Sequence, residues 1–112
     1  MIRALFICGK ARARSPTAAQ VFSAWDGVST DFGGISDDAD DVLSADQLDW
    51  ANAIFVMEQR HARRLSDRFA HVLQGKAVVN LSVRDKYTFM QDELIQVLID
   101  KAGPHLSQGK RR

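Results

Sequence analysis

The sequence predicts an α/β domain with a mainly parallel sheet, and three observations lead to this class. Apolar runs typical of buried strands recur along the chain. They alternate with segments whose apolar residues have helical spacing, the order typical of parallel sheets. The length of 112 residues suits one domain with a single modest core. We therefore expect residues 1–112 to form one three-layer domain, a four-stranded sheet with helices on both faces.

Four short apolar segments are the expected strands, and they are residues 2–7, 28–32, 53–57 and 77–81. The first is expected to lead directly into a phosphate-binding loop. In open α/β sheets, ligands bind at the carboxyl ends of the strands, so the segments that follow these runs are where a site is expected.

Helix start and stop signals complete the pattern. Ser15 is expected as an N-cap with Pro16 at the first helical position, and the apolar face of this helix reaches Trp25. Ser44 and Gln47 have the spacing of a capping box for a short helix. Two further helices are expected over residues 58–70 and 92–101, the last stopped by Gly103 and Pro104.

Composition excludes several classes of protein. With 46% hydrophobic and 26% charged residues the chain is typical of a globular domain, and no apolar run approaches the roughly 18 residues of a membrane span. One cysteine excludes an internal disulfide and a cysteine-rich metal site. A chain without disulfides is typical of the cytoplasm, where a thiol stays reduced, so we expect a cytoplasmic protein. A net charge of +1 gives no overall attraction to nucleic acid or membranes. No feature indicates an oligomeric state, and residues 107–112 are expected to be disordered.

The charges are unevenly distributed. Residues 31–49 contain seven aspartates and no lysine or arginine, whereas residues 60–68 contain four arginines. We interpret these as a solvated loop and a solvated helix face. The three histidines, His61, His71 and His105, lack metal-site spacing and are expected at the surface.

The most informative segment runs from Cys8 to Pro16, between an expected strand and an expected helix. The N–H groups of such a loop and of a helix N-terminus can point at one anion. Arg14 adds a planar fork that matches two phosphate oxygens. Cys8 lies in the same positive field, and such a field favours the thiolate form of a cysteine. A thiolate facing a bound phosphate predicts nucleophilic phosphoryl transfer.

Cys8 and Arg14, followed by Ser15, Pro16, Thr17 and Ala18, resemble the signature of the low-molecular-weight protein tyrosine phosphatases, and most of all their short bacterial branch. Residues 48–51 and 54–58, with His61 and Leu65, are similar to the third strand and following helix of that branch. Residues 85–90 and 93–95 are similar to its C-terminal segment, so the likeness covers nearly the whole chain.

The resemblance implies a cysteine-dependent phosphomonoester hydrolase that needs no metal or other cofactor. Cys8 would attack phosphorus and form a cysteinyl-phosphate, and Ser15 would hydrogen-bond its sulfur. Arg14 and the loop amides would bind the phosphate oxygens, and the remaining loop residues are Gly9, Lys10, Ala11, Arg12 and Ala13. The substrate would be a phosphotyrosine protein or a small phosphate ester.

The resemblance also requires an acid that protonates the leaving oxygen and then activates water. Asp85 is our candidate, because it precedes the aromatic pair Tyr87 and Phe89 on a loop, and Asp92 is the alternative. Tyr87 and Phe89 are the candidate walls of a substrate slot.

Three residues depart from the family pattern. The family usually has Asn where this chain has Ala11 and Ser where it has Phe32, and in the short branch a proline precedes the acid, where this chain has Arg84. These departures motivate an alternative: a non-catalytic module that binds phosphate or phosphoproteins. A thiol arsenate reductase and a nucleic-acid-binding protein are weaker alternatives, since the chain has one cysteine and a net charge of only +1.

Lys10 and Arg12 leave two interpretations open. Their charges favour substrates with additional negative charge, such as nucleotides, sugar phosphates or acidic phosphopeptides. Alternatively, both side chains point toward solvent and the acidic segment.

Overall fold

The computed structural model describes residues 1–106, and a sheet of four parallel strands lies at its centre in the order β2–β1–β3–β4. The strands are β1 (Ile2–Cys8), β2 (Val28–Gly34), β3 (Ala53–Val56) and β4 (Val78–Asn80). All four expected strands are present, and β2 extends two residues further than predicted. The tail that we expected to be disordered, residues 107–112, lies outside the described residues.

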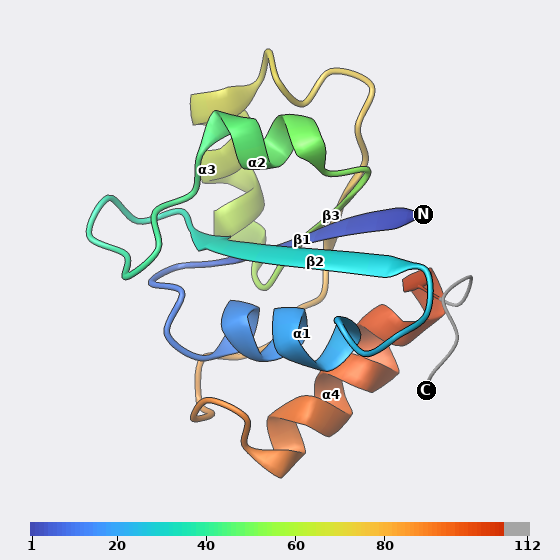
Figure 1. Cartoon of the computed structure of the whole chain (residues 1–112). Coiled ribbons are helices and arrows are strands. Elements are labelled where there is room, and N and C mark those ends of the chain that lie inside the picture. The colour runs from blue at the N-terminus through green and yellow to red at the C-terminus, as the bar shows by residue number, and fades with distance from the viewer. Residues whose placement is uncertain (107–112) are drawn as a thin grey trace.

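Helices cover both faces of this sheet (Figure 1). On one face lie α1 (Arg14–Phe22) and α4 (Asp92–Ala102), and on the other lie α2 (Ala45–Trp50) and α3 (Gln59–Phe69). A short 3₁₀ helix, η1 (Gly103–Leu106), follows α4. The predicted three-layer α/β architecture, with a loop between β1 and α1, is confirmed.

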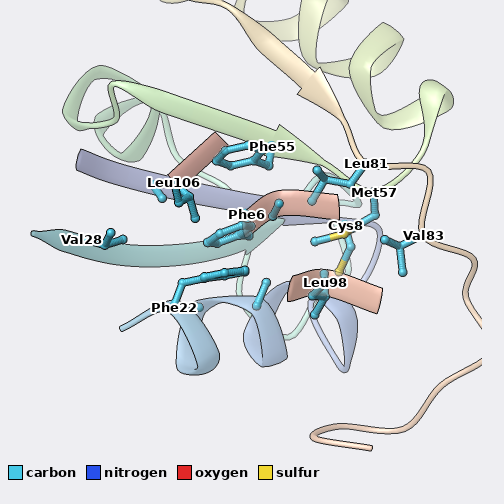
Figure 2. Close-up of a cluster of buried hydrophobic side chains, with 14 of the residues drawn as sticks. Phe6, Cys8, Phe22, Val28, Phe55, Met57, Leu81, Val83, Leu98 and Leu106 are labelled. Atoms are coloured by element: carbon cyan, nitrogen blue, oxygen red, sulfur yellow. The ribbon is translucent and has the colours of Figure 1, made fainter. Parts of the chain in front are cut away.

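From Ala4 to Cys8 the central strand β1 is apolar, because both of its faces are buried there. Phe6 and Cys8 belong to the cluster under α1 and α4, whereas Leu5 and Ile7 belong to the cluster under α2 and α3. The Phe6 ring stacks with Phe22 and Phe55, at centroid distances of 5.6 and 5.2 Å. Figure 2 shows Cys8 within this cluster, so the end of β1 joins the core to the loop that follows.

The two predicted helix starts have different outcomes. Ser44 caps α2 through the predicted capping box with Gln47. Ser15 is not an N-cap: α1 begins at Arg14, Ala13 occupies the cap position without a side-chain hydrogen bond, and Ser15 is fully buried inside the first turn. The Ser15 hydroxyl faces the Cys8 sulfur instead of the helix backbone. The helix also ends earlier than expected, at Phe22 instead of near Trp25.

No helix within residues 1–106 is long and apolar enough to cross a membrane.

We expect Gly34→Ala to destabilise the protein by about 2 kcal/mol, the scale of overpacking in a dense interior. Gly34 ends β2 opposite Cys8, and a Cβ atom there would lie 2.6 Å from the carbonyl oxygen of Gly9. Denaturant unfolding followed by circular dichroism measures the change. Gly9→Ala is the matched control, because its Cβ would meet its nearest neighbour at an ordinary 3.7 Å. Equal stability of the two variants would contradict the close approach of β2 to the loop.

Candidate active site

The outer side of the loop after β1 is tied to the segment that follows β2. The carbonyl oxygens of Cys8, Gly9 and Lys10 accept hydrogen bonds from the N–H groups of residues 35, 36 and 40, at 2.9, 3.0 and 3.0 Å. The peptide bonds are trans, so the N–H group of each peptide unit points away from its carbonyl. The N–H groups of Gly9, Lys10 and Ala11 therefore point away from the segment of residues 35–40.

Four consecutive N–H groups of the loop are available to a ligand. Within residues 1–106, the N–H groups of Lys10, Ala11, Arg12 and Ala13 have no hydrogen-bond acceptor. The N-terminus of α1 follows them immediately. Consecutive free N–H donors beside a helix N-terminus form an anion-binding arrangement, since both carry partial positive charge.

Cys8 lies at the base of this loop. Its side chain is buried, among the apolar residues Met57, Val83 and Leu98 of the first cluster (Figure 2). The Cys8 Sγ atom is 3.0 Å from Ser15 Oγ, within hydrogen-bonding distance. Because α1 begins at Arg14, the Ser15 hydroxyl faces the Cys8 sulfur and does not cap the helix, contrary to the sequence prediction.

Arg14 closes the loop from a buried position. Its side chain is only 3% exposed, and Nη1 donates to Glu58 Oε2 at 2.5 Å and to the carbonyl oxygen of Val83 at 2.8 Å. Asp85 Oδ2 lies 3.8 Å from Arg14 Nη2. Both Glu58 and Val83 follow the carboxyl ends of neighbouring strands, so these ends hold the guanidinium in place.

Glu58 is a site residue that the sequence reasoning missed. Hydrogen bonds from Arg60 and Arg14 outweigh the cost of partial burial and lower the pKa of Glu58 from 4.5 to about 2, so it is ionised at neutral pH. A signal was present: Glu58 directly follows the strand-like run of residues 53–57. Carboxyl ends of parallel strands meet at one edge of a sheet, the edge where β1 also ends.

The prediction of a surface position for His61 is wrong, because its side chain is about 1% exposed. It lies four residues before Leu65, on the same face of α3, and that face packs on the core. Within residues 1–106 neither ring nitrogen has a hydrogen-bond partner. Burial, and then the charge of Arg14, lower the pKa of His61 to about 4, so the ring is neutral at neutral pH. His71 and His105 are exposed, as expected.

Lys10 and Arg12 point toward the acidic segment. Lys10 pairs with Asp38, and Arg12 Nε lies 3.3 Å from Asp40 Oδ1. All four side chains are substantially exposed, so each pair contributes little to stability. The pairs do connect the loop to the segment after β2, beside the backbone bonds described above.

Asp85, and not Asp92, is near Arg14. The Asp85 side chain is 68% exposed at the rim of the loop, whereas Asp92 is the exposed first residue of α4. The loop that carries Asp85 is tied to α1, because the N–H of Met90 donates to Thr17 Oγ1 at 2.9 Å. Arg84 is exposed beside Asp85.

Neither of the expected aromatic walls belongs to the lining of the hollow beside Arg14. Tyr87 is half-buried against the first cluster. Phe89 is half-exposed and lines a separate hollow of about 450 Å³ over α1 and β2, together with Pro16 and Phe32. Phe32 also packs on the first cluster, so this departure from the family pattern adds apolar contact.

Ala11 has a left-handed backbone conformation, with φ of +60°, and is buried. This region is unfavourable for residues with a Cβ atom and is most accessible to Gly and Asn. The family's usual Asn at this position therefore suits the conformation better than alanine does. The loop of this chain accepts backbone strain at Ala11.

No cluster of three or more His, Cys, Asp or Glu side chains within residues 1–106 is arranged to hold a metal ion.

Solved structures of phosphatases share this architecture. Wzb of Vibrio vulnificus, solved with benzylphosphonate, is 17% identical with a TM-score of 0.76, and the match covers 96% of this chain and 98% of Wzb. The low molecular weight protein tyrosine phosphatase SP-PTP of Streptococcus pyogenes is 14% identical, with a TM-score of 0.74 and coverages of 96% and 93%. The YwlE arginine phosphatase of Geobacillus stearothermophilus is 19% identical, with a TM-score of 0.71 and coverages of 96% and 94%.

No family model matches the chain, and neither does any curated protein. The structural likeness therefore defines the fold, which is that of the low-molecular-weight protein tyrosine phosphatases. The fold expected from the motif around Cys8 is confirmed.

We expect Glu58→Gln to lower the free energy of unfolding at pH 7 by about 2 kcal/mol, because it leaves the buried Arg14 charge without its partner. The depressed pKa of Glu58 stabilises the fold above pH 4.5. That contribution is lost as the carboxylate is protonated between about pH 4.5 and about 2. Urea unfolding of wild type and Glu58→Gln across pH 2.5–7 should therefore show that the difference between their free energies of unfolding shrinks as the pH falls.

Asp67→Asn on the same helix is the control for this experiment. It removes the same charge at an exposed position, and we expect a change within about 0.5 kcal/mol. A difference between wild type and Glu58→Gln that is as large at pH 2.5 as at pH 7 would show that the ion pair is not its source.

We expect Ala11→Val to destabilise the protein by about 2 kcal/mol more than Ala13→Val does. A β-branched side chain is strongly disfavoured at a φ of +60°, whereas Ala13 has a negative φ of −135°, outside the left-handed region. Thermal unfolding of the two variants measures the difference. Similar melting temperatures would contradict a left-handed conformation at Ala11.

Proposed function

We propose that the protein is a metal-independent phosphomonoester hydrolase that acts through Cys8. The observation that carries this proposal is the position of the Cys8 sulfur, 3.0 Å from the Ser15 hydroxyl at the base of a loop of free N–H groups. The buried guanidinium of Arg14 closes the same loop. A nucleophile, an anion site and a fixed cation thus lie within residues 8–14.

In the first step the phosphoryl group of the substrate lies in the loop, and the Cys8 thiolate attacks phosphorus. A sulfur–phosphorus bond forms and the ester phosphorus–oxygen bond breaks. Asp85 donates its proton to the leaving oxygen. Its place at the rim, 3.8 Å from Arg14, supports this role over that of Asp92.

In the second step a water molecule attacks the cysteinyl-phosphate. The Asp85 carboxylate takes a proton from the water, the sulfur–phosphorus bond breaks, and inorganic phosphate is released. The Ser15 hydroxyl donates a hydrogen bond to the departing thiolate, which makes Cys8 a better leaving group. Each cycle returns Cys8 and Asp85 to their initial protonation states.

Arg14 binds and orients the phosphoryl group. Its Nη1 atom is engaged by Glu58 and Val83, so the donors left for two phosphate oxygens are on Nε and Nη2. Glu58 fixes the plane of the guanidinium and is a positioning residue. A fixed cation and preorganised N–H groups stabilise charge that develops on the oxygens, which is the main catalytic contribution in phosphoryl transfer.

The proposed substrates are a phosphotyrosine protein or a small phosphate ester, acted on in the cytoplasm. Similar structures include tyrosine and arginine phosphatases, and one was solved with benzylphosphonate. These names support a substrate with a phosphoryl group but do not indicate which molecule bears that group.

A second candidate function is a binding module that holds phosphate without turnover. The strained Ala11 in the loop favours it, because loop geometry must be accurate for catalysis but less so for binding. Such a protein would bind phosphate or vanadate and hydrolyse nothing.

We expect wild-type protein to hydrolyse phenyl phosphate between pH 4.5 and 8, and Cys8→Ser to have no measurable activity. Phenoxide is a poor leaving group, so loss of the acid in Asp85→Asn should lower kcat by about 10²–10⁴-fold. Asp92→Asn is the matched comparison, and an equally large loss there would move the acid to Asp92.

Activity of Cys8→Ser equal to wild type would refute the mechanism. An inactive wild type that binds vanadate would favour the binding module, and the absence of both activity and anion binding would refute both functions.

A further inference from the structure

A recess of about 200 Å³ opens beside the first half of the loop, and we call it the α3 recess. It is lined by residues from the loop, the segment after β2, the start of α3 and the rim: Gly9, Lys10, Arg14, Ile35, Ser36, Arg60, His61, Arg64 and Asp85. Cys8 and the second half of the loop, residues 11–13, are not part of this lining. The recess thus contains Arg14 and Asp85 of the candidate site and extends from them to the start of α3.

Four cationic side chains and the carboxylate of Asp85 line the α3 recess. Lys10 is paired with Asp38, and Arg14 and Arg60 are paired with Glu58. Within residues 1–106, Arg64 has no ion pair, because the nearby acidic segment pairs with Arg68, Lys10 and Arg12 instead. Arg60 and Arg64 are four residues apart on one face of α3, a spacing at which like charges repel. This concentration of charge does not stabilise the helix.

His61 gives a second, independent indication of a ligand. Its ring is about 1% exposed, lines the recess, and has two nitrogen atoms without a hydrogen-bond partner within residues 1–106. Nε2 lies 3.8 Å from Glu58 Oε2, beyond hydrogen-bond distance. A neutral imidazole has one N–H donor and one acceptor, and a buried polar group left unpaired is unfavourable. A Cβ atom at Gly9 would lie 3.7 Å from Nε2, so this nitrogen faces the loop side of the recess. An oxygen atom in the recess would satisfy it.

We propose that the α3 recess binds a second anionic group of the substrate while the loop holds the phosphoryl group that reacts. The inference rests on the proposed function of the loop. The substrate class is small phosphate esters that carry a second phosphoryl or carboxylate group. The Arg64 guanidinium and the His61 N–H group are the donors that distinguish such a substrate from a simple monoester.

The size and the walls of the site agree with this class. The recess has room for a compact charged group, and its lining is polar or charged apart from Gly9 and Ile35. The two aromatic residues expected to hold an aryl ring, Tyr87 and Phe89, lie against the core and over another hollow. Charge, and not aromatic contact, therefore dominates the surroundings of the loop.

Isothermal titration calorimetry with non-hydrolysable ligands tests the proposal without needing turnover. Methylphosphonate occupies the loop alone, whereas methylene- and ethylenediphosphonate carry a second phosphoryl group. Phosphonoacetate and 3-phosphonopropionate carry a carboxylate in its place, so the series distinguishes the two kinds of second group. Ionic strength is kept constant in metal-free buffer, because salt screens exposed charges.

We expect at least one two-anion ligand to bind wild-type protein about tenfold more tightly than methylphosphonate, and Arg64→Gln to lose most of that gain. Arg63→Gln is the matched control, since Arg63 is on the same helix, is exposed, and lines a different surface hollow. It removes the same charge and should keep the gain.

The proposal is overturned if no two-anion ligand gains affinity, or if both arginine variants lose the gain equally, which would indicate a general charge effect. Failure of the proposed function is distinguishable. If methylphosphonate does not bind wild-type protein, the loop is not an anion site and the proposed function fails, whereas methylphosphonate binding without any gain from a second anionic group overturns the recess proposal alone.

Discussion

A guanidinium that is 3% exposed must be compensated, and the ion pair between Arg14 and Glu58 provides that compensation. It joins three parts of the chain that are far apart in sequence: the loop after β1, the segment after β3, and, through the carbonyl oxygen of Val83, the segment after β4. The order of the sheet makes this possible, because β1, β3 and β4 are parallel neighbours that end at the same edge. The start of α1 is held by these strand ends and not by a capping side chain.

The other side of the loop is held by backbone contacts. Three of its carbonyl groups bind residues 35–40, and Gly34 lets β2 approach the backbone of Gly9 closely. This arrangement directs the N–H groups of the loop away from the protein's own acceptors. The loop is thereby fixed from two sides, which allows Ala11 to keep a left-handed conformation that its side chain does not favour.

The hollow beside the loop is lined mainly by polar and charged side chains. Positive charge from α3 and the unpartnered ring of His61 lie on one side, and the exposed carboxylate of Asp85 lies at the rim. Of these groups only His61 is buried without a hydrogen-bond partner within residues 1–106, and such a group is unfavourable unless a ligand pairs with it. The hydrophobic core, by contrast, is conventional, with both faces of β1 covered by helices.

The sequence by itself determined the order of strands and helices, the parallel sheet and the loop from Cys8 to Arg14, because apolar periodicity and local motifs are encoded by neighbouring residues. It also indicated Asp85 and left Asp92 as the alternative, because the distance of each carboxylate from Arg14 depends on how the loop packs. Only the tertiary structure decided that Ser15 faces Cys8, that Glu58 holds Arg14, and that His61 is buried beside the loop. These contacts join residues from different strand ends, and their geometry depends on how the strands are ordered in the sheet, which no local pattern specifies.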